Sequence, residues 1–504
     1  MFEGQPKGLW ALALANTGER FGYYTMLAVF LLYLQANYGF APGLASGIYS
    51  TFLMLVYFLP VIGGAAADKF GFGKMVTSGI VIMFIGYLLL SVPLGANTTA
   101  VIAMGAALLL VSFGTGLFKG NLQVMVGKLY DAPEYSDKRD SGFSLFYMAI
   151  NIGALFAPTA ATTIMSWAQN DLGYSKADSY HFAFAVACVS VIVSILIYFL
   201  GKKTYLQVLT ADKKKDGNKD EAVEEMSPAE TKERIVCLCL VFAVVIFFWM
   251  AFHQNGLTLT WFADEFTARE ATGATGMMFN VLNLVWCILM VFGICGLLTA
   301  PKDATGKSKL VNLALIVVPA IILVYTYFTS GNETVAIDAP IFQQFNPCFV
   351  VALTPVSIAL FGWLGRIGKE PKAPVKIGLG MLVAAGAYLL MTMSSIGLPA
   401  TDHPNHVADV TPNLLVSTYL ILTFAELLLS PIGISFVSKV APPKYKGMIM
   451  GGWFVATALG NKLVSIPGHM WDMPLPVVWG TLMVICLLAA LFIFSIIKKL
   501  NRVS

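Results

Sequence analysis

Charged residues are scarce in this chain. Asp, Glu, Lys and Arg make up 12% of its 504 residues, whereas an ordinary soluble domain has about 25%. A soluble chain of this length would fold as several domains, each of which needs a charged surface. The scarcity of charge therefore excludes a cytosolic enzyme, a disordered scaffold and a basic nucleic-acid-binding protein.

The residue groups that mark catalysis or metal binding are also absent. The sequence has no H-E-x-x-H motif and no GxxxxGK[ST] loop, so a metalloprotease and an ATP-driven pump are excluded. Four of the five histidines (His181, His403, His406 and His469) lie at the ends of apolar runs or between them. The seven cysteines show no metal-type spacing and are expected to behave as small hydrophobic residues. We expect neither an enzyme nor a protein with a metal or cofactor, and we find no filter-like loop typical of a channel.

Long apolar runs occupy most of the chain. A membrane-spanning helix needs about 20 mainly apolar residues, and uniformly apolar runs of this length are typical of helices rather than of barrel strands. The predicted spans are 8–35, 45–67, 75–95, 99–127, 142–168, 180–201, 235–263, 276–300, 310–329, 340–365, 376–396, 413–438, 447–470 and 476–497. The first run is too long for a signal-peptide core, so we expect it to be retained. The sequence predicts an all-α polytopic membrane protein with about fourteen spans.

Lys and Arg are unevenly distributed over the predicted loops. If the N-terminus is inside, the cytoplasmic loops and tail hold Lys69, Lys74, Lys128, Lys138, Arg139, Lys302, Lys307, Arg366, Lys369, Lys372, Lys439, Lys444, Lys446, Lys498 and Lys499. The opposite loops hold only Lys176 and Arg269. By the positive-inside rule, this bias predicts that both termini are cytoplasmic. The polar segment 202–234 is then a solvated cytoplasmic linker, with a lipid-surface or regulatory role as the alternative.

Five charged residues remain inside the predicted spans: Glu19, Arg20, Lys119, Glu426 and Lys462. Each costs about 2.5–3.5 kcal/mol at the centre of a bilayer on insertion scales, so five facing lipid would cost roughly 12–17 kcal/mol. This cost rivals the net stability of a whole fold. We therefore expect these side chains to face one another or a water-filled cavity, and the alternative for any one of them is a structural pair between helices.

Polar side chains of the first span share one helical face. Asn16, Arg20, Tyr23 and Tyr24 recur at the helical period, with Glu19 beside them. Two cations on one side of a cavity and an anion on the other suit a zwitterion. The carboxylate end would bind Arg20 and Lys119, whereas the ammonium end would bind Glu426.

A proton site is also predicted in the first span. Glu19 is adjacent to Arg20, and a substrate carboxylate that engaged Arg20 would weaken the Glu19–Arg20 interaction and favour proton uptake by Glu19. Glu426 is the alternative proton carrier.

Seven motifs in chain order resemble the proton-coupled oligopeptide transporters of the major facilitator superfamily. They are ERFGYY at 19–24, GGAAADKFGFGK at 63–74, FYMAINIG at 146–153, FWMAFHQ at 248–254, FQQFNP at 342–347, AELLLSPIG at 425–433, and WF with GN at 453–461. The resemblance covers nearly the whole chain. It implies the major facilitator fold and import of di- and tripeptides by proton symport, through alternating access of two six-helix bundles.

The resemblance also implies roles for particular residues. Arg20, Tyr24 and Lys119 would contact the peptide carboxylate, and Asn151, Asn346 and Glu426 its amino end. Tyr23, Tyr57, Trp249, Gln254, Trp453 and Phe454 would line the pocket or its gates. Proton coupling would use Glu19, Glu426 and His253, and a cytoplasmic loop motif would contain Gly64, Asp68 and Gly71. The alternative for the aromatic residues is simple packing, and for the two asparagines it is interhelical hydrogen bonding.

The chain departs from the family pattern in its proton-coupling residues. Asn16 stands where the family usually has Glu, and Leu27 and His253 stand near the positions of a cation and an acid that form a gate pair. Joint loss of both partners avoids a buried orphan charge. The alternatives are therefore the same fold with another small solute, or a peptide facilitator with altered or lost coupling. His253 would either take over part of the coupling or serve as a packing residue.

The resemblance also predicts the division of the chain. The expected parts are a six-helix bundle at 1–201, the linker at 202–234, the first helix of a second bundle at 235–275, an accessory two-helix hairpin at 276–330, and the rest of the second bundle at 331–504. We expect a monomer in the plasma membrane (the bacterial inner membrane), whose partners are small peptides, protons and lipid, and no nucleic acid.

Overall fold

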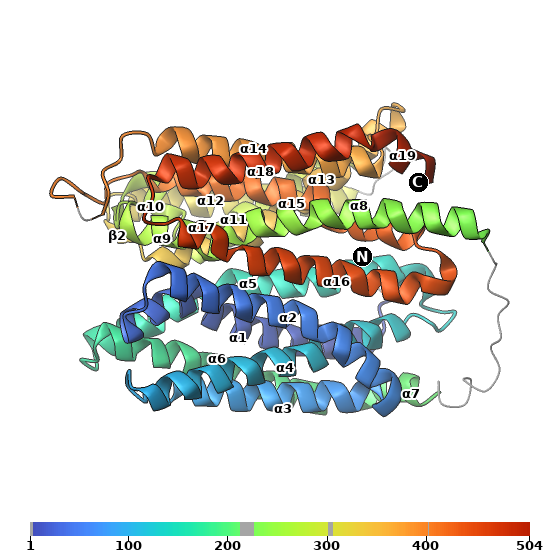
Figure 1. Cartoon of the computed structure of the whole chain (residues 1–504), viewed down its shortest axis with the longest axis horizontal. Helices are drawn as coiled ribbons and strands as arrows, with labels where there is room; N and C mark the ends of the chain where they lie inside the picture. Colours follow the sequence, from blue (N-terminus) through green and yellow to red (C-terminus); the bar gives the residue numbers. More distant parts are fainter. Residues whose placement is uncertain (1–3, 212–225, 301–305, 402, 504) are drawn as a thin grey trace. The chain divides into compact units, whose positions relative to one another are not determined.

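The computed structural model describes residues 4–211, 226–300, 306–401 and 403–503, and helices dominate this part of the chain (Figure 1). Each of the fourteen predicted spans corresponds to one helix or to helical segments separated by a short turn. Thirteen helical segments within the described residues are long and apolar enough to cross a membrane. Helix α1 (Lys7–Tyr38) is also long enough, but it is less apolar because it carries several polar residues, Glu19 and Arg20 among them. The predicted all-α membrane fold is confirmed.

The described chain divides into two compact units. Unit 1 contains residues 1–250 and 440–469, and unit 2 contains residues 251–439 and 470–504. The predicted bundles had other boundaries, and the division into six-helix halves stays a prediction.

Unit 1 is built of helices packed along one another. Its elements are α1, α2 (Pro42–Phe70), α3 (Phe72–Ser91), α4 (Thr98–Lys128), η1 (Ser136–Lys138), α5 (Arg139–Asn170), α6 (Lys176–Leu200), α7 (Lys202–Ala211), α8 (Pro228–Phe252), η5 (Pro443–Tyr445), α16 (Lys446–Leu463) and α17 (Ser465–His469). Helix α1 packs on α5 and α6, α3 packs on α4 and α6, and α2 packs on α4, α16 and α17.

Unit 2 contains the remaining elements. They are η3 (His253–Gly256), α9 (Thr258–Glu265), β1 (Glu270–Ala271), α10 (Gly273–Met277), α11 (Val281–Leu298), α12 (Gly306–Ser330), β2 (Val335–Ala336), η4 (Ala339–Gln344), α13 (Phe345–Arg366), α14 (Ala373–Ser394), α15 (Pro412–Val440), α18 (Leu475–Ser495) and α19 (Ile497–Val503). Strands β1 and β2 are antiparallel, with Glu270 opposite Ala336 and Ala271 opposite Val335. Helix α12 packs mainly on α11, and only 6% of its apolar window is buried.

Local signals in the sequence set the ends of several helices. The Asn97 side chain caps α4 by accepting a hydrogen bond of 2.9 Å from the Ala100 N–H, and Ser175 caps α6 through the Asp178 N–H. Pro42 occupies the first position of α2, where its missing N–H costs no hydrogen bond. Between α2 and α3, Gly71 adopts a φ of 93°, which side-chain-bearing residues rarely adopt.

Close helix packing in unit 1 depends on glycines of the GTGLFKGN segment at 114–121. A Cβ on Gly114 would lie 2.8 Å from the backbone nitrogen of Met83 in α3, and one on Gly116 would lie 2.9 Å from the backbone of Leu59 in α2. On α2, a Cβ on Gly63 would collide with the carbonyl of Gly116. Gly114 and Gly116 therefore allow α4 to lie at backbone distance from both neighbours.

The predicted solvated linker is helical at its start. Residues 202–211 form α7, in which Tyr205 is buried and donates a hydrogen bond of 2.6 Å to the carbonyl of Tyr198. Burial raises the pKa of this phenol well above its ordinary value. Residues 212–225 of the linker lie outside the described residues, as does Lys302. The Tyr205 contact explains why this polar segment begins as an ordered helix.

Candidate functional site

Glu19 and Arg20 form a fully buried ion pair on α1. Their side chains are 0% and 3% exposed. The Arg20 Nε donates to one carboxylate oxygen of Glu19 at 2.5 Å, and one terminal nitrogen of the guanidinium donates to the other oxygen at 2.6 Å. This two-bond geometry is the same as Arg uses to bind a free carboxylate. Glu19 therefore occupies Arg20 in the way that a ligand carboxylate would.

Aromatic side chains surround this pair. The Arg20 guanidinium carbon lies 4.6 Å from the ring centre of Tyr23, a distance typical of a cation–π contact. The Tyr23 ring meets Tyr24 edge-on at 5.2 Å and stacks on Phe52 of α2 at 6.2 Å. Arg20 thus has its charge opposed by Glu19 and its face covered by a phenol.

Lys119 lies on α4 near the ion pair. Its ammonium lies 4.0 Å from the ring centre of Tyr57, and it interacts electrostatically with Arg20 and Glu19. The structure therefore brings five predicted residues of unit 1 together: Glu19, Arg20, Tyr23, Tyr57 and Lys119. With Arg20 and Lys119 both in their ordinary charged forms, two cations share one carboxylate, and the formal charge of this cluster is positive.

Other predicted residues of unit 1 lie on α5, α8 and α16. Asn151 is 8% exposed, and its amide donates a hydrogen bond of 3.0 Å to the Tyr147 carbonyl of its own helix, α5. Trp249 and Trp453 are 7% and 3% exposed, and Phe454 is partly exposed. A Cβ on Gly460 of α16 would lie 2.9 Å from the Trp249 Cβ, so the two helices touch there.

Lys462 is paired with a neutral group. Its ammonium donates a hydrogen bond of 2.6 Å to the Thr51 hydroxyl of α2. This contact joins α16 to α2, and no pattern in the sequence signals it because Thr51 is uncharged.

Glu426 of α15 is the central group of the predicted residues in unit 2. The Asn346 amide of α13 donates to the Glu426 carboxylate at 3.0 Å and to the Thr423 hydroxyl at 3.1 Å. Asn346 and Glu426 are thus brought together as predicted. Thr423 was missed, although its spacing of three residues from Glu426 places both on one helical face.

The remaining predicted residues of unit 2 lie where α8 gives way to η3. Gln254 is fully buried, and its side-chain oxygen accepts a hydrogen bond of 2.7 Å from the Thr258 hydroxyl. His253 is partly exposed and meets the Phe252 ring edge-on at 5.5 Å. These contacts hold the break between two helical segments.

The predicted loop motif lies at the junction of α2 and α3. Asp68 is exposed, Gly64 is partly exposed and Gly71 makes the turn. The Lys128 ammonium at the end of α4 lies 4.9 Å from the ring centre of Phe72, which begins α3. This contact ties α4 to the turn.

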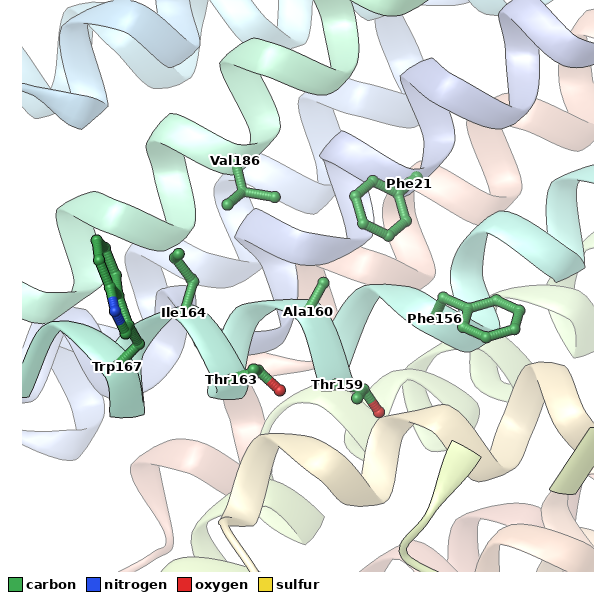
Figure 2. A pocket seen from close by; sticks show the side chains of 8 residues that line it. All are labelled: Phe21, Phe156, Thr159, Ala160, Thr163, Ile164, Trp167 and Val186. Atoms are coloured by element: carbon green, nitrogen blue, oxygen red, sulfur yellow. The ribbon is translucent and has the colours of Figure 1, made fainter. Parts of the chain in front are cut away.

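An apolar pocket of about 690 Å³, largely open to its surroundings, lies beside α5 (Figure 2). Its lining residues are Phe21 of α1, Phe156, Thr159, Ala160, Thr163, Ile164 and Trp167 of α5, and Val186 of α6. Only Phe21 belongs to a motif singled out in the sequence. The three- and four-residue spacing along α5 could have predicted a shared face, but periodicity cannot tell a cavity from packing.

Comparison with known proteins identifies similar sequences and folds. The sequence pattern of the POT family matches residues 73–220 and 321–473. The chain is 28% identical to the uncharacterized transporter YclF of Bacillus subtilis over 95% of this chain and 91% of that protein. It is 26% identical to a di-/tripeptide transporter of Lactococcus lactis subsp. cremoris over 92% and 89%. A crystal structure of the peptide transporter POT in complex with sulfate superposes with a TM-score of 0.74 at 24% identity, covering 100% of this chain and 96% of the other.

Proposed function

This chain belongs to the POT family, and we propose on this basis that it is a secondary active transporter. It imports di- and tripeptides together with protons by alternating access. The observation that carries the proposal is the buried cluster of unit 1, in which two cations, Arg20 and Lys119, share one acid, Glu19. A surplus of cations within the membrane-spanning helices suits the carboxylate of a peptide.

In this proposal, Arg20, Tyr24 and Lys119 bind the peptide carboxylate. The substrate carboxylate replaces Glu19 on Arg20 and uses the same two-bond geometry. Lys119 exchanges its contact with the Tyr57 ring for a direct ionic hydrogen bond. Both cations already have weaker or replaceable partners, which lowers the cost of binding.

The amino end of the peptide binds Glu426, Asn346 and Asn151. Glu426 accepts one hydrogen bond from Asn346, so its other lone pairs can accept from an ammonium group. Asn151 must first release the Tyr147 carbonyl of its own helix. The walls or gates of the peptide pocket are formed by Tyr23, Tyr57, Trp249, Gln254, Trp453 and Phe454.

Proton coupling is centred on Glu19. Displacement of Glu19 from Arg20 leaves a buried carboxylate without its cation, and protonation removes that unfavourable charge. Glu426 and His253 are the other proposed proton carriers. Asn16 is buried and carries no charge, so a relay through a second carboxylate at this position cannot operate.

The proposed setting follows from the loop charges. The transporter lies in the plasma membrane, which is the inner membrane in bacteria, with both termini cytoplasmic. It works as a monomer, and Gly64, Asp68 and Gly71 act in the conformational change.

The test is uptake of a labelled dipeptide into proteoliposomes with and without an inward proton gradient. We expect saturable uptake that the gradient accelerates. Absence of saturable uptake under both conditions would exclude peptide transport and favour another small solute. Equal uptake under both conditions would leave peptide transport standing and remove proton coupling, the alternative that Asn16 favours.

A further inference from the structure

Tyr87 of α3 is a buried tyrosine that the proposed mechanism does not use. Its side chain is 0% exposed, and its hydroxyl has no hydrogen-bond partner among the described residues. A buried hydroxyl without a partner is unfavourable, and such groups are few in native structures. Its position therefore needs an explanation beyond packing.

The charged groups near Tyr87 belong to the buried ion pair. The Cys188 thiol of α6 contacts the carbonyl of Phe84, which precedes Tyr87 on α3 by one turn. The carbonyl of the adjacent Ala187 would lie 3.0 Å from a Cβ on Gly22 of α1, two residues after Arg20. Tyr87 is thus within electrostatic range of Glu19 and Arg20. It thus approaches Glu19 from α3, a helix that contributes no other residue to the proposed site.

The geometry of the ion pair explains why the Tyr87 hydroxyl has no partner. Arg20 donates to both carboxylate oxygens of Glu19 through two short bonds. The carboxylate is fully buried, and its strongest hydrogen-bonding directions are taken by the guanidinium. While Arg20 is bound in this way, the Glu19 carboxylate is a poor hydrogen-bond acceptor for the Tyr87 hydroxyl.

The hydrogen-bonding needs of Glu19 change when Arg20 binds another carboxylate instead. Glu19 is then a buried acid without a cation, and it needs a new partner. Lys119 is the other nearby cation, but its ammonium lies on the Tyr57 ring and the proposed function assigns it to the substrate. A phenol can donate to an ionised carboxylate or accept from a protonated one, so Tyr87 can serve Glu19 in either protonation state.

We propose that Tyr87 is a positioning residue that takes the Glu19 carboxyl when Arg20 releases it. The Glu19 carboxyl then alternates between two hydrogen-bond partners, Arg20 and Tyr87. In this structure it is bound to Arg20, which is why the Tyr87 hydroxyl has no partner among the described residues. The exchange lowers the cost of freeing Arg20 for a ligand. This role rests on the proposed function, but the exchange itself can be tested without a peptide.

The first test is a cycle of thermal unfolding measurements on the purified protein without ligand. Tyr87→Phe removes an unpartnered hydroxyl, so the unfolding temperature stays the same or rises. Arg20→Met removes the cation, and the Glu19 carboxyl then forms a hydrogen bond with Tyr87. In this background, Tyr87→Phe removes that bond and lowers the unfolding temperature. A decrease of equal size in both backgrounds would show a structural hydroxyl and overturn the proposal.

The second test measures dipeptide binding, and it remains available if the Arg20→Met protein does not fold. Tyr87→Phe weakens dipeptide binding and raises the Kd by about five- to tenfold, the usual effect of losing one hydrogen bond. An unchanged Kd would overturn the proposal. If the wild-type protein binds no dipeptide, the proposed function has failed, and the ligand-free cycle alone decides on Tyr87.

Ser112→Ala is the matched control for both tests. Ser112 of α4 is also fully buried, and its hydroxyl also lacks a partner among the described residues. It is not part of the proposed binding site. We expect no dependence on the Arg20→Met background and a Kd within about twofold of wild type. If Ser112→Ala had the same effect as Tyr87→Phe, loss of any buried hydroxyl would explain the result. That outcome would also overturn the proposal.

Discussion

At the scale of single residues, the intramembrane charges differ in how they are satisfied. Glu19 and Arg20 neutralise each other, whereas Lys462 contacts a hydroxyl and Lys119 an aromatic ring. Glu426 accepts a hydrogen bond from an amide, which leaves its charge uncompensated by that contact. A charge with a neutral partner gains most from a ligand of opposite sign, and we therefore expect Glu426 to be sensitive to substitution.

Glu426→Gln tests this expectation. The substitution keeps the shape and the hydrogen bond to Asn346 but removes the charge that binds a peptide ammonium. Because ionic hydrogen bonds contribute about 1.5–3 kcal/mol, we expect uptake of a labelled dipeptide in proteoliposomes to fall by about tenfold or more.

Glu265→Gln is the control for this variant. Glu265 is a second acid of unit 2, and its carboxylate oxygens accept hydrogen bonds of 3.0 and 3.2 Å from the Trp471 indole. It lies outside the proposed site, so uptake should stay within about twofold of wild type. Equal losses in both variants would contradict a specific role for Glu426.

Glu19→Gln separates proton coupling from substrate binding. The neutral amide cannot take up a proton, so uptake driven by a proton gradient should be abolished. Exchange of labelled for unlabelled dipeptide without a gradient needs no net proton movement and should persist. Loss of both activities would indicate that Glu19 is needed for binding or folding instead.

Sequence patterns single out the intramembrane charges but not the neutral side chains that contact them. Glu19, Arg20, Lys119 and Glu426 could be found because burying a charge in a membrane is costly. Thr423, Thr51 and Tyr87 carry no charge and are common in helices, so composition gave no signal for them. Their roles follow only from the packing of one helix against another.

At the scale of elements, the crossing of α2 and α4 is determined by glycines. Gly63→Ala places a Cβ against the Gly116 carbonyl, and the two helices must separate. We expect a loss of about 1–3 kcal/mol in stability, measured as a lower unfolding temperature of the purified protein. The transport assay is not needed for this test.

The adjacent glycine provides the control. A Cβ on Gly64 would meet nothing within 4 Å. Gly64→Ala should therefore stabilise α2 by about 0.5–1 kcal/mol because alanine favours the helix. If both variants lowered the unfolding temperature equally, the helix crossing would not be the cause.

Helices were the most predictable elements, because long apolar runs leave a membrane chain few other structures. The start of the linker was less predictable. Its charged residues predicted solvation, but the burial of Tyr205 anchors α7. The β1–β2 pair was also missed, since two-residue strands are too short to show alternation.

At the scale of the whole molecule, the chain is an integral membrane protein of a transporter family, and its loop charges predict which side each loop faces. Lys176 and Lys369 are both exposed and lie in loops assigned to opposite sides. In a background without the seven native cysteines, an impermeant thiol reagent should label Lys176→Cys in intact cells. It should label Lys369→Cys only after the membrane is opened. The reverse pattern would invert the topology.

The fold alone does not determine the substrate, because one fold can serve many solutes. The sequence predicted the membrane fold and the charged residues of the candidate site. It could not show the Glu19–Arg20 geometry, in which one acid occupies the group proposed to bind the ligand.

The exposed surface of α12 connects the protein to the thickness of its bilayer. With 25 residues, this helix is about 37 Å long, whereas the hydrocarbon core is about 30 Å thick. Such a mismatch is relieved by tilting, kinking or local thickening of the lipid. Because α12 packs mainly on α11, its tilt changes few other helix contacts within unit 2. Lipid chain length should therefore alter the angle of this hairpin before it disturbs the helices that hold the charges.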